Sequence, residues 1–250
     1  MHPTLFKLGG LPLHAYGLLV ALGFLAGILV TINYAKKEKI AAEAVLDLAI
    51  YVIIAAIVGA RIFYVLGQLD HFLANPLEIV MVQNGGLVFL GGLFLSFLVV
   101  VLYAKKKKLN LIKLLDAITP GVALGYALGR LGCFLNGCCF GLPTSLPFGV
   151  IFPPDSLAGA YCPGERLHPT QLYSALTMLL VFFFLIWLYR RKRYNGQVLY
   201  WGLILYSVYR FLVEFLRFSP VHILLLTPSQ WLVIITFILG VVGLLKNRKS

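Results

Sequence analysis

Residues 13–34 read LHAYGLLVALGFLAGILVTINY, a run without a single Lys, Arg, Asp or Glu. A helix needs about 20 mainly apolar residues to cross the hydrocarbon core of a bilayer, so this run predicts a membrane-spanning helix. Only Lys7 precedes it, whereas lysines cluster just after it within residues 36–39, which is the wrong polarity for a cleavable signal peptide. We expect the helix to stay as an anchor with the N-terminus outside.

The apolar pattern of this run recurs along the whole chain. The 250 residues are 60% hydrophobic and 12% charged, and their mean hydropathy is +0.92, which lies far outside the range of soluble domains. The segments predicted to cross the membrane are 13–34, 45–67, 86–104, 111–129, 169–189, 197–217 and 229–245. The linkers leave no room for a second domain. We therefore predict an all-α integral membrane protein, a bundle of seven transmembrane helices that forms one domain over residues 1–250.

Most basic residues fall on one side of this predicted topology. Seven spans place fifteen of the 21 Lys and Arg residues in linkers or ends on the side of the C-terminus: Lys36, Lys37, Lys39, Lys105, Lys106, Lys107, Lys108, Lys113, Arg190, Arg191, Lys192, Arg193, Lys246, Arg248 and Lys249. Because cytoplasmic loops are enriched in Lys and Arg, that side is predicted to be the cytoplasm. The net charge of +12 then reflects topology and contact with anionic membrane lipids, and we expect no nucleic acid partner.

Three arginines lie inside or at the ends of predicted spans, each toward the outer end: Arg61, Arg130 and Arg210. We expect them to converge at one depth near the outer leaflet. A charged side chain in hydrocarbon costs at least ~2.5 kcal/mol, so it usually faces a cavity or a partner. Because a guanidinium grips two phosphate oxygens at once, these residues predict an outward-opening pocket for a phospholipid headgroup. The alternative is structural, through snorkelling or an ion pair such as Arg210 with Glu214, four residues apart on one helix.

The end of the fourth predicted span carries a glycine repeat beside Arg130. Glycine recurs there every four residues, which permits close helix packing: Gly121, Gly125 and Gly129. Pro120 is expected to kink or shorten the helix. Arg130, which has no acid nearby in the sequence, is then expected where the helix meets an irregular, glycine-rich segment. Such backbone is tolerated at membrane depth only when it lines a cavity or is buried in protein.

Residues 129–141 read GRLGCFLNGCCFG. They resemble the motif Gly-Arg-x-Gly-Asn-Phe-x-Asn-x-Glu-x-x-Gly of the prolipoprotein diacylglyceryl transferase family, with Cys133 in place of the asparagine and Cys138 in place of the glutamate. Other blocks similar to the family are YGLLVALGF from Tyr16, GARIFYVL with Arg61, ANPLEI followed by GGLVFLGGL, HPTQLY at 168–173 and YRFLVEFLR at 209–217. These blocks stand in the family's order, so the resemblance extends over most of the chain.

This resemblance implies transfer of the diacylglyceryl group of phosphatidylglycerol to the thiol of a lipobox cysteine in a secreted prolipoprotein, with release of glycerol phosphate. The partners would be phosphatidylglycerol, lipobox segments and membrane lipids, with no cofactor and no metal. The active site of this single catalytic domain would face the outer leaflet of the bacterial plasma membrane. The resemblance assigns catalysis to Arg130, Arg210 and Tyr16. It assigns substrate binding to Arg130, Asn136, Arg61, Glu214, His168 and Gln171.

Two further positions depart from the family. Where the family usually reads Phe-His-Gly-Gly, with a histidine proposed to act in catalysis, this chain has Leu90, and Ser174 replaces the usual glutamate after HPxQLY. The reaction needs a thiolate, because a free thiol with a pKa of about 8.5 is mostly protonated at neutral pH. The remaining candidates for the base are Tyr16, His14, His168 and Glu214, unless positive potential alone lowers the pKa of the substrate thiol.

Two rival functions stay open. Leu90, Cys133 and Cys138 suggest a paralogue with the same scaffold and altered chemistry. A permease for lipids or phosphate compounds would use the same arginines to hold its ligand. It would also predict inverted repeats with interrupted helices, and the sequence has no such symmetry.

All four cysteines are expected on the outward side, where disulfides persist: Cys133, Cys138, Cys139 and Cys162. We favour a disulfide from Cys162 to Cys138 or Cys139, which would staple the long outer loop. The alternative is a zinc site, although the spacing lacks a CxxC and matches no standard zinc pattern. Its ligands would be Cys133, Cys138, Cys162 and His168.

Overall fold

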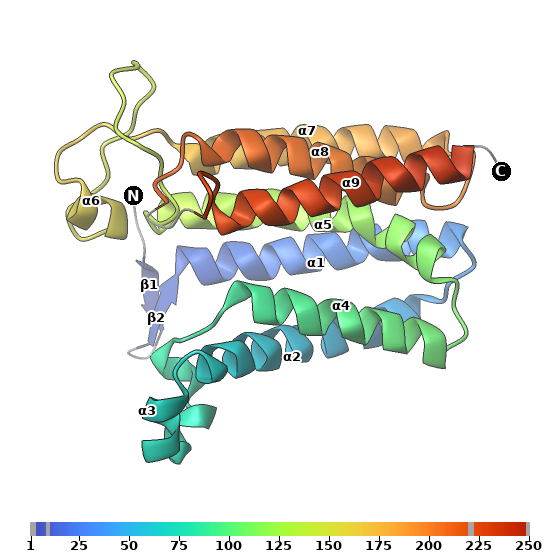
Figure 1. Cartoon of the computed structure of the whole chain (residues 1–250), viewed down its shortest axis with the longest axis horizontal. Coiled ribbons are helices and arrows are strands. Elements are labelled where there is room, and N and C mark those ends of the chain that lie inside the picture. The colour runs from blue at the N-terminus through green and yellow to red at the C-terminus, as the bar shows by residue number, and fades with distance from the viewer. Residues whose placement is uncertain (1–3, 9–10, 220–222, 249–250) are drawn as a thin grey trace. The chain divides into compact units, whose positions relative to one another are not determined.

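The computed structural model describes residues 4–8, 11–219 and 223–248. Along the chain it contains β1 (Thr4–Leu8), β2 (Leu11–His14), α1 (Ala15–Lys37), α2 (Ala42–Leu66), α3 (Leu69–Ala74), two 3-10 turns (Pro76–Val80 and Val82–Asn84), α4 (Phe89–Lys106), α5 (Leu111–Leu135), α6 (Leu157–Tyr161), α7 (Thr170–Arg190), α8 (Gln197–Glu214) and α9 (Pro228–Arg248) (Figure 1). Every segment predicted to span the membrane is a helix, so the all-α architecture is confirmed. The short hairpin of β1 and β2 was not predicted.

Six helices among the described residues are long and apolar enough to cross a membrane: α1, α2, α4, α5, α7 and α9. The chain is therefore a helical, multi-pass membrane protein. The remaining predicted span, α8, is less apolar because polar side chains interrupt it, among them Ser207, Arg210 and Glu214. These three side chains are buried inside the protein. A polar face of this kind is tolerated in a membrane when it packs on protein.

The chain divides into two compact units, residues 1–34 with 115–250 and residues 35–114. In the first unit, β1 and β2 pair antiparallel, with Thr4 opposite His14 and Leu8 opposite Leu11. Further along this unit, α8 packs against both α7 and α9 (Figure 1). In the second unit, α2 packs along α4.

Glycines bring α1 and α5 into backbone contact within the first unit. A Cβ added at Gly121 would lie 2.4 Å from the carbonyl oxygen of Gly27, and one added at Gly23 would lie 2.9 Å from that of Gly125. The close packing predicted for Gly121 and Gly125 is therefore confirmed. For Gly129 the prediction is wrong, because no atom lies within 4 Å of its Cβ position.

Pro120 does not end α5, which runs on to Leu135, six residues beyond the predicted end at 129. A proline inside a helix lacks the N–H that would bond to the carbonyl one turn earlier. The carbonyl that the N–H of an ordinary residue at position 120 would bond is that of Asp116. In this turn the Thr119 hydroxyl donates to the Leu115 carbonyl at 2.7 Å.

Asp116 of α5 fixes the start of α8. Its carboxylate accepts from the backbone N–H of Gly196 at 2.7 Å and of Leu199 at 2.9 Å, and from Nζ of Lys192 at 3.4 Å. The side chain of Asp116 is fully buried. The first N–H groups of a helix lack partners within it, and α8 has no cap from its own side chains. Asp116 therefore accepts from backbone N–H groups at the start of α8 and joins this helix to α5.

In the second unit, α2 and α4 cross at a pair of glycines. A Cβ at Gly59 would lie 2.4 Å from the carbonyl oxygen of Gly91, and a Cβ at Gly91 would lie 2.3 Å from that of Gly59. Any larger side chain at either position would push the helices apart. Leu90, beside this crossing, is exposed on α4.

Candidate active site

Arg130 lies within α5 and not at the end of the helix, where it was predicted to meet an irregular segment, because α5 extends to Leu135. Its Nη2 donates to the Tyr126 hydroxyl at 2.6 Å, and its guanidinium carbon lies 4.7 Å from the centre of the Tyr126 ring. The two residues are four apart, so they share one face of the helix. Within the described part of the chain no carboxylate pairs with Arg130, and its charge remains free to meet a ligand.

Further aromatic and hydroxyl side chains of the first unit extend from this contact. The Tyr126 ring packs edge-on against Tyr206 at 5.7 Å between centroids, and Tyr206 packs against Tyr209 at 6.4 Å. The Tyr209 hydroxyl donates to the Ser174 hydroxyl, which donates to the Thr170 carbonyl at 2.5 Å. Ser174, which replaces a glutamate of the resembled motif, thus takes part in a buried hydrogen-bonded chain.

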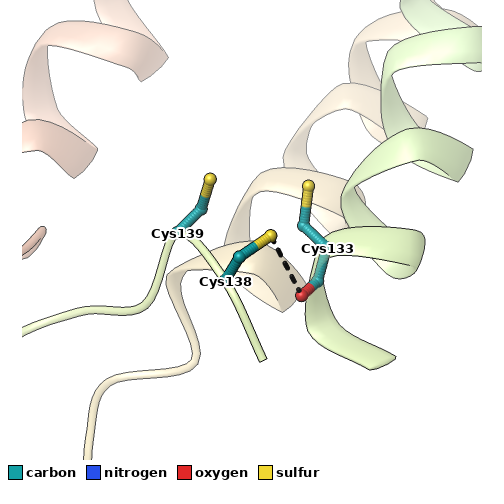
Figure 2. A group of neighbouring side chains, drawn as sticks. All are labelled: Cys133, Cys138 and Cys139. Carbon is teal, nitrogen blue, oxygen red and sulfur yellow. Dashed lines mark hydrogen bonds between the residues drawn. The ribbon is translucent and has the colours of Figure 1, made fainter. Parts of the chain in front are cut away.

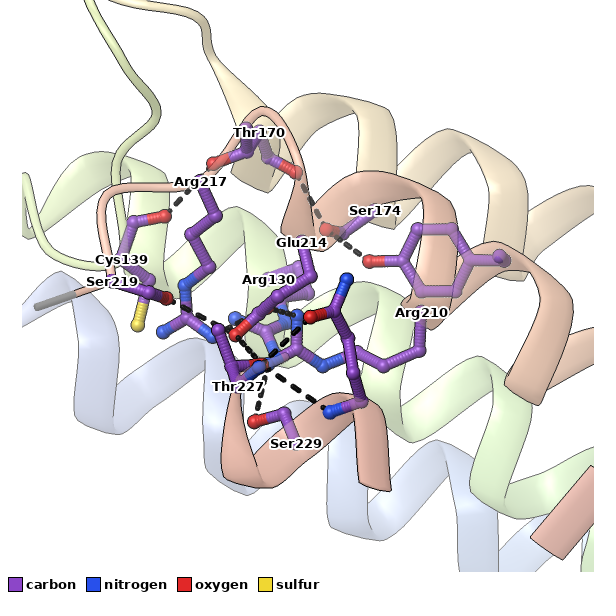
Figure 3. Close-up of polar contacts among 12 residues, drawn as sticks. Arg130, Cys139, Thr170, Ser174, Arg210, Glu214, Arg217, Ser219, Thr227 and Ser229 are labelled. Carbon is purple, nitrogen blue, oxygen red and sulfur yellow. Dashed lines mark hydrogen bonds and ion pairs between the residues drawn. The ribbon is translucent and has the colours of Figure 1, made fainter. Parts of the chain in front are cut away.

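The Glu214 carboxylate is the centre of a second cluster (Figure 3). It accepts from Arg210 on the same face of α8 and lies 3.8 Å from Arg217. The cluster also contains two hydroxyl donors to Glu214: Ser219 at 3.1 Å and Thr227 at 3.0 Å. Arg210 and Glu214 are only 6% and 5% exposed, so this is a buried ion pair. The pairing predicted four residues apart is confirmed.

Three arginines share one region of the first unit and outnumber the carboxylates of that region: Arg130, Arg210 and Arg217. Cys139 interacts electrostatically with Arg217 and Arg130, and Tyr206 interacts with Arg210 and Arg130. Three positive charges against the one described negative charge, that of Glu214, leave a net charge of +2. In addition, Nε of Arg217 is buried without a partner among the described residues. Such an excess of guanidinium donors suits the charge of a phosphate.

Three cysteines gather beside these arginines (Figure 2). The sulfur atoms of Cys133, Cys138 and Cys139 all lie within 4.8 Å of one another, and each residue is half-buried. The Cys138 thiol donates to the Cys133 carbonyl at 3.7 Å. Hydrogen bonds from Cys133 and Cys138, together with the charges of Arg217 and Arg130, hold the pKa of the Cys139 thiol below its usual value.

The predicted disulfide between Cys162 and Cys138 or Cys139 is wrong, because all four cysteines are free thiols. Cys162 packs instead against an apolar cluster in the segment after α5: Phe140, Phe152, Ala158 and Leu167. Burial in this cluster gives Cys162 a packing role that needs no bond to sulfur. The predicted zinc ligand set is also not formed, because Cys139 takes the place of Cys162 and His168 in the close group.

The first turn of α7 holds the loop that carries Cys138 and Cys139. Oγ1 of Thr170 donates to the Cys139 carbonyl at 2.9 Å, and Nε2 of Gln171 donates to the Cys138 carbonyl at 2.8 Å. The other amide atom of Gln171, Oε1, is buried and has no partner in the described residues. Gln171, a predicted substrate-binding residue, thus supports the cysteine loop and keeps a free acceptor.

Tyr16 lies at the start of α1, against α5. A Cβ added at Gly132 would be 3.3 Å from its ring, so the two helices meet closely there. Tyr16 also lies near enough to Arg130 and to the three clustered cysteines for their charges to interact. The structure therefore brings together Tyr16 and Arg130, two of the residues predicted for catalysis.

Asn136 and His168 flank the same loop. The Asn136 side chain interacts with the Cys138 thiol. His168 presents Nδ1 at 3.3 Å from the Tyr173 hydroxyl, while its backbone carbonyl accepts from the N–H of Gly141 at 3.0 Å. One ring nitrogen of His168 thus contacts Tyr173, and the residue is not a member of the close cysteine group.

Arg61 belongs to the second unit, where main-chain carbonyls occupy its donors. These carbonyls follow α3: Glu78, Ile79 at 2.9 Å, Gly85 at 2.8 Å and Gly86 at 3.2 Å. Its guanidinium carbon also lies 5.5 Å from the Tyr64 ring centre and 5.2 Å from that of Phe72. Arg61 therefore ties the segment between α3 and α4 to α2, and its contact with a headgroup stays a prediction.

A model of the family described as prolipoprotein diacylglyceryl transferase matches residues 3–246. The chain belongs to the prolipoprotein diacylglyceryl transferase family. Relatives named phosphatidylglycerol-prolipoprotein diacylglyceryl transferase are similar over their full length. The protein of Clostridium tetani is 38% identical over 242 residues, which cover 96% of each chain. That of Finegoldia magna is 36% identical over 251 residues, covering 100% of this chain and 97% of its own, and that of Synechococcus elongatus is 35% identical over 248 residues, covering 97% and 86%.

Some residues of this transferase site were missed by the sequence reasoning. Tyr126 carried a signal, because it precedes Arg130 by four residues on a predicted helix. Tyr209 stands in the block YRFLVEFLR that resembles the family, but its contact with Ser174 was not predicted. Tyr206 and Thr227 carried no signal, since their contacts join different segments of the chain.

Proposed function

We propose that this transferase moves the diacylglyceryl group of phosphatidylglycerol onto the thiol of a lipobox cysteine in a secreted prolipoprotein. Its family and the names of its full-length relatives support this reaction. The observation that carries the assignment of the site is the guanidinium of Arg130, which no described carboxylate neutralises. The thiol sulfur bonds to the glyceryl carbon, the bond from that carbon to the phosphate oxygen breaks, and glycerol phosphate leaves.

Arg130 and Arg210 have the chemistry to stabilise the departing phosphate. Negative charge grows on the leaving oxygen in the transition state, and preorganised cations lower the barrier where charge develops. No described carboxylate neutralises the charge of Arg130, whereas Arg210 donates to Glu214 and to the Ser229 hydroxyl at 3.1 Å. The buried Nε of Arg217 offers one further donor.

The remaining predicted residues are proposed to position the two substrates. Tyr16 interacts with both Arg130 and the cysteine cluster, so it is proposed to contact both the lipid phosphate and the substrate thiol. The free Oε1 of Gln171 is an acceptor for a hydroxyl or amide of a substrate. Asn136 and His168 flank the same loop and complete the proposed set.

We also propose seven spans with the N-terminus outside and the C-terminus in the cytoplasm, in the bacterial plasma membrane. The basic residues in the last turns of α1, α4 and α7 support this orientation. The site residues near the start of α1 and the end of α5 would then face the outer leaflet, where secreted precursors and phosphatidylglycerol meet.

Leu90 favours a second candidate, a paralogue with the same scaffold and altered chemistry. A leucine cannot accept the proton that the resembled family's histidine is proposed to take. Complementation separates the two candidates: the gene is expressed in a bacterium whose own transferase is depleted. We expect growth to be restored by the natural chain and not by Arg130→Ala. Failure of the natural chain, although it is inserted in the membrane, would favour the paralogue.

A further inference from the structure

The Cys133, Cys138 and Cys139 cluster is the one group of soft metal ligands that the described residues bring together. Cys133 comes from the last turns of α5, and the other two come from the loop that follows (Figure 2). Cys139 has a positive φ of 60°, an uncommon conformation for a residue with a side chain. Neighbouring residues in extended backbone point in opposite directions, so this turn allows two adjacent cysteines to face one centre. Strained backbone of this kind often marks a functional site.

The spacing of the three sulfurs fits one zinc ion. Zn–S bonds of about 2.3 Å at a tetrahedral centre place the sulfurs about 3.8 Å from one another. The sulfurs lie within 4.8 Å of one another, so binding needs each of them to move by less than about 1 Å. Three protein ligands with a fourth position left open are the arrangement of catalytic zinc sites, whereas structural sites use four.

Two hydrogen bonds from α7 hold the ligand loop in this arrangement. Thr170 and Gln171 donate to the carbonyls of Cys139 and Cys138, respectively, at 2.9 and 2.8 Å. Such support orients ligands before the metal arrives. Both donors are themselves buried, so water does not compete for these bonds.

The cluster also answers a chemical need of the proposed reaction. The substrate thiol must lose its proton, and Leu90 cannot take it. We propose that Cys133, Cys138 and Cys139 bind one Zn²⁺ whose open position takes the lipobox thiol as a thiolate. This inference rests on the proposed function, and it departs from the sequence-based expectation of no metal.

The step balances without any oxidant or reductant. The thiol binds zinc and releases its proton to solvent, because metal coordination deprotonates a thiol. The sulfur electron pair forms the bond to the glyceryl carbon, and the carbon–oxygen bond breaks with its pair on the phosphate oxygen. The product thioether is neutral and a poorer ligand than a thiolate, so it leaves zinc, which stays Zn²⁺ throughout.

The charges around the cluster favour this complex. Three thiolates and Zn²⁺ sum to −1, and a bound substrate thiolate makes the site −2. Buried negative charge is costly unless cations lie close. Arg130 and Arg217 both interact with Cys139, so they offset this charge, and Arg130 would also reach the phosphate that leaves.

The test uses the purified full-length protein in detergent and measures bound metal by elemental mass spectrometry. We expect one zinc per chain. Cys139→Ser should lower the zinc content at least about tenfold, since even the loss of an outer hydrogen-bond partner costs about 10–100-fold in metal affinity. Cys162→Ser is the matched control and should keep its zinc, because Cys162 lies in the apolar cluster.

A second measurement needs no variant and so does not depend on how well a variant folds. Zinc is replaced with Co²⁺, which should give a thiolate-to-cobalt absorption band. A lipobox peptide with its cysteine should strengthen that band, and the same peptide with serine should not. Chelation of the metal should abolish transfer, and added Zn²⁺ should restore it.

The outcomes separate this inference from the proposed function. Full transfer by metal-free protein would overturn the zinc site and leave the proposed function standing. A disulfide within the cluster in place of metal, or a cobalt band that the cysteine peptide does not change, would also overturn the inference. A peptide-dependent cobalt band without any transfer would support the metal site and contradict the proposed function.

Discussion

Arg130 and Arg210 differ in the side chains that bind their guanidinium groups. Arg210 is buried against Glu214, whereas Arg130 has no carboxylate partner among the described residues and contacts the hydroxyl and ring of Tyr126. A guanidinium without a carboxylate partner retains both its charge and its forked donors for a phosphate. The two residues are therefore expected to respond differently to substitution.

We predict that Arg130→Lys is strongly impaired and Arg130→Ala still more so. A point charge does not reproduce the two parallel hydrogen bonds of a guanidinium. The loss of one charge-assisted bond is worth about 1.5–3 kcal/mol, or about ten- to hundredfold in rate if the bond acts in the transition state. Transfer of labelled diacylglyceryl at limiting lipid concentration measures the loss. A lysine variant as fast as the natural chain would exclude a bidentate grip.

Glu214→Gln should destabilise the protein by about 3 kcal/mol, because it leaves the buried Arg210 charge without its counter-ion. Exchanging the two residues, by Arg210→Glu together with Glu214→Arg, should recover part of that stability. It should not restore transfer if Arg210 meets the phosphate. Thermal unfolding in detergent and the transfer assay give the two readouts. Recovery of transfer by the exchanged pair would instead make Arg210 a purely structural residue.

At the scale of helices, the close approach of α1 and α5 gives a matched pair of glycine substitutions. A Cβ at Gly121 would meet the Gly27 carbonyl at 2.4 Å, whereas a Cβ at Gly129, on the same helix, meets nothing within 4 Å. We predict that Gly121→Ala lowers the free energy of unfolding by about 1–3 kcal/mol through overpacking. Gly129→Ala should be neutral or slightly stabilising. Equal effects of the two substitutions would contradict the described packing.

Asp116 gives a second prediction at this scale. Asp116→Ala removes the acceptor for the buried N–H groups of Gly196 and Leu199. Each unsatisfied buried donor costs about 1–3 kcal/mol, so the loss of stability should be at least about 2 kcal/mol. Asp116→Asn keeps one acceptor oxygen, so its stability should lie between those of the natural chain and Asp116→Ala. Thermal unfolding of the three proteins checks the order, and an alanine variant as stable as the natural chain would contradict it.

The elements were largely predictable because apolar runs of about 20 residues dominate the sequence. The glycine repeat correctly indicated the contacts of Gly121 and Gly125, since small residues four apart share a face. The continuation of α5 beyond residue 129 was mispredicted, because a proline in the sequence indicates a kinked or shortened helix. The cysteine cluster was missed because it depends on the backbone turn at Cys139, which the spacing of thiols does not reveal.

The orientation of the whole molecule follows from its basic residues. Seven spans put fifteen Lys and Arg residues on the side of the C-terminus, which predicts a cytoplasmic C-terminus. A fluorescent protein fused after Ser250 should therefore be bright, and alkaline phosphatase fused there should be inactive. An active phosphatase would reverse the topology and place the arginine and cysteine clusters on the cytoplasmic side.

We propose that this chain alkylates a lipobox thiol with phosphatidylglycerol and that Arg130 holds the phosphate. The most direct test mixes the purified protein with phosphatidylglycerol labelled in its diacylglyceryl group and a lipobox peptide. We expect a labelled thioether with the cysteine peptide, none with the matched serine peptide, and a loss of at least about a hundredfold in rate for Arg130→Ala. No transfer by the folded natural chain, or undiminished transfer by Arg130→Ala, would contradict it.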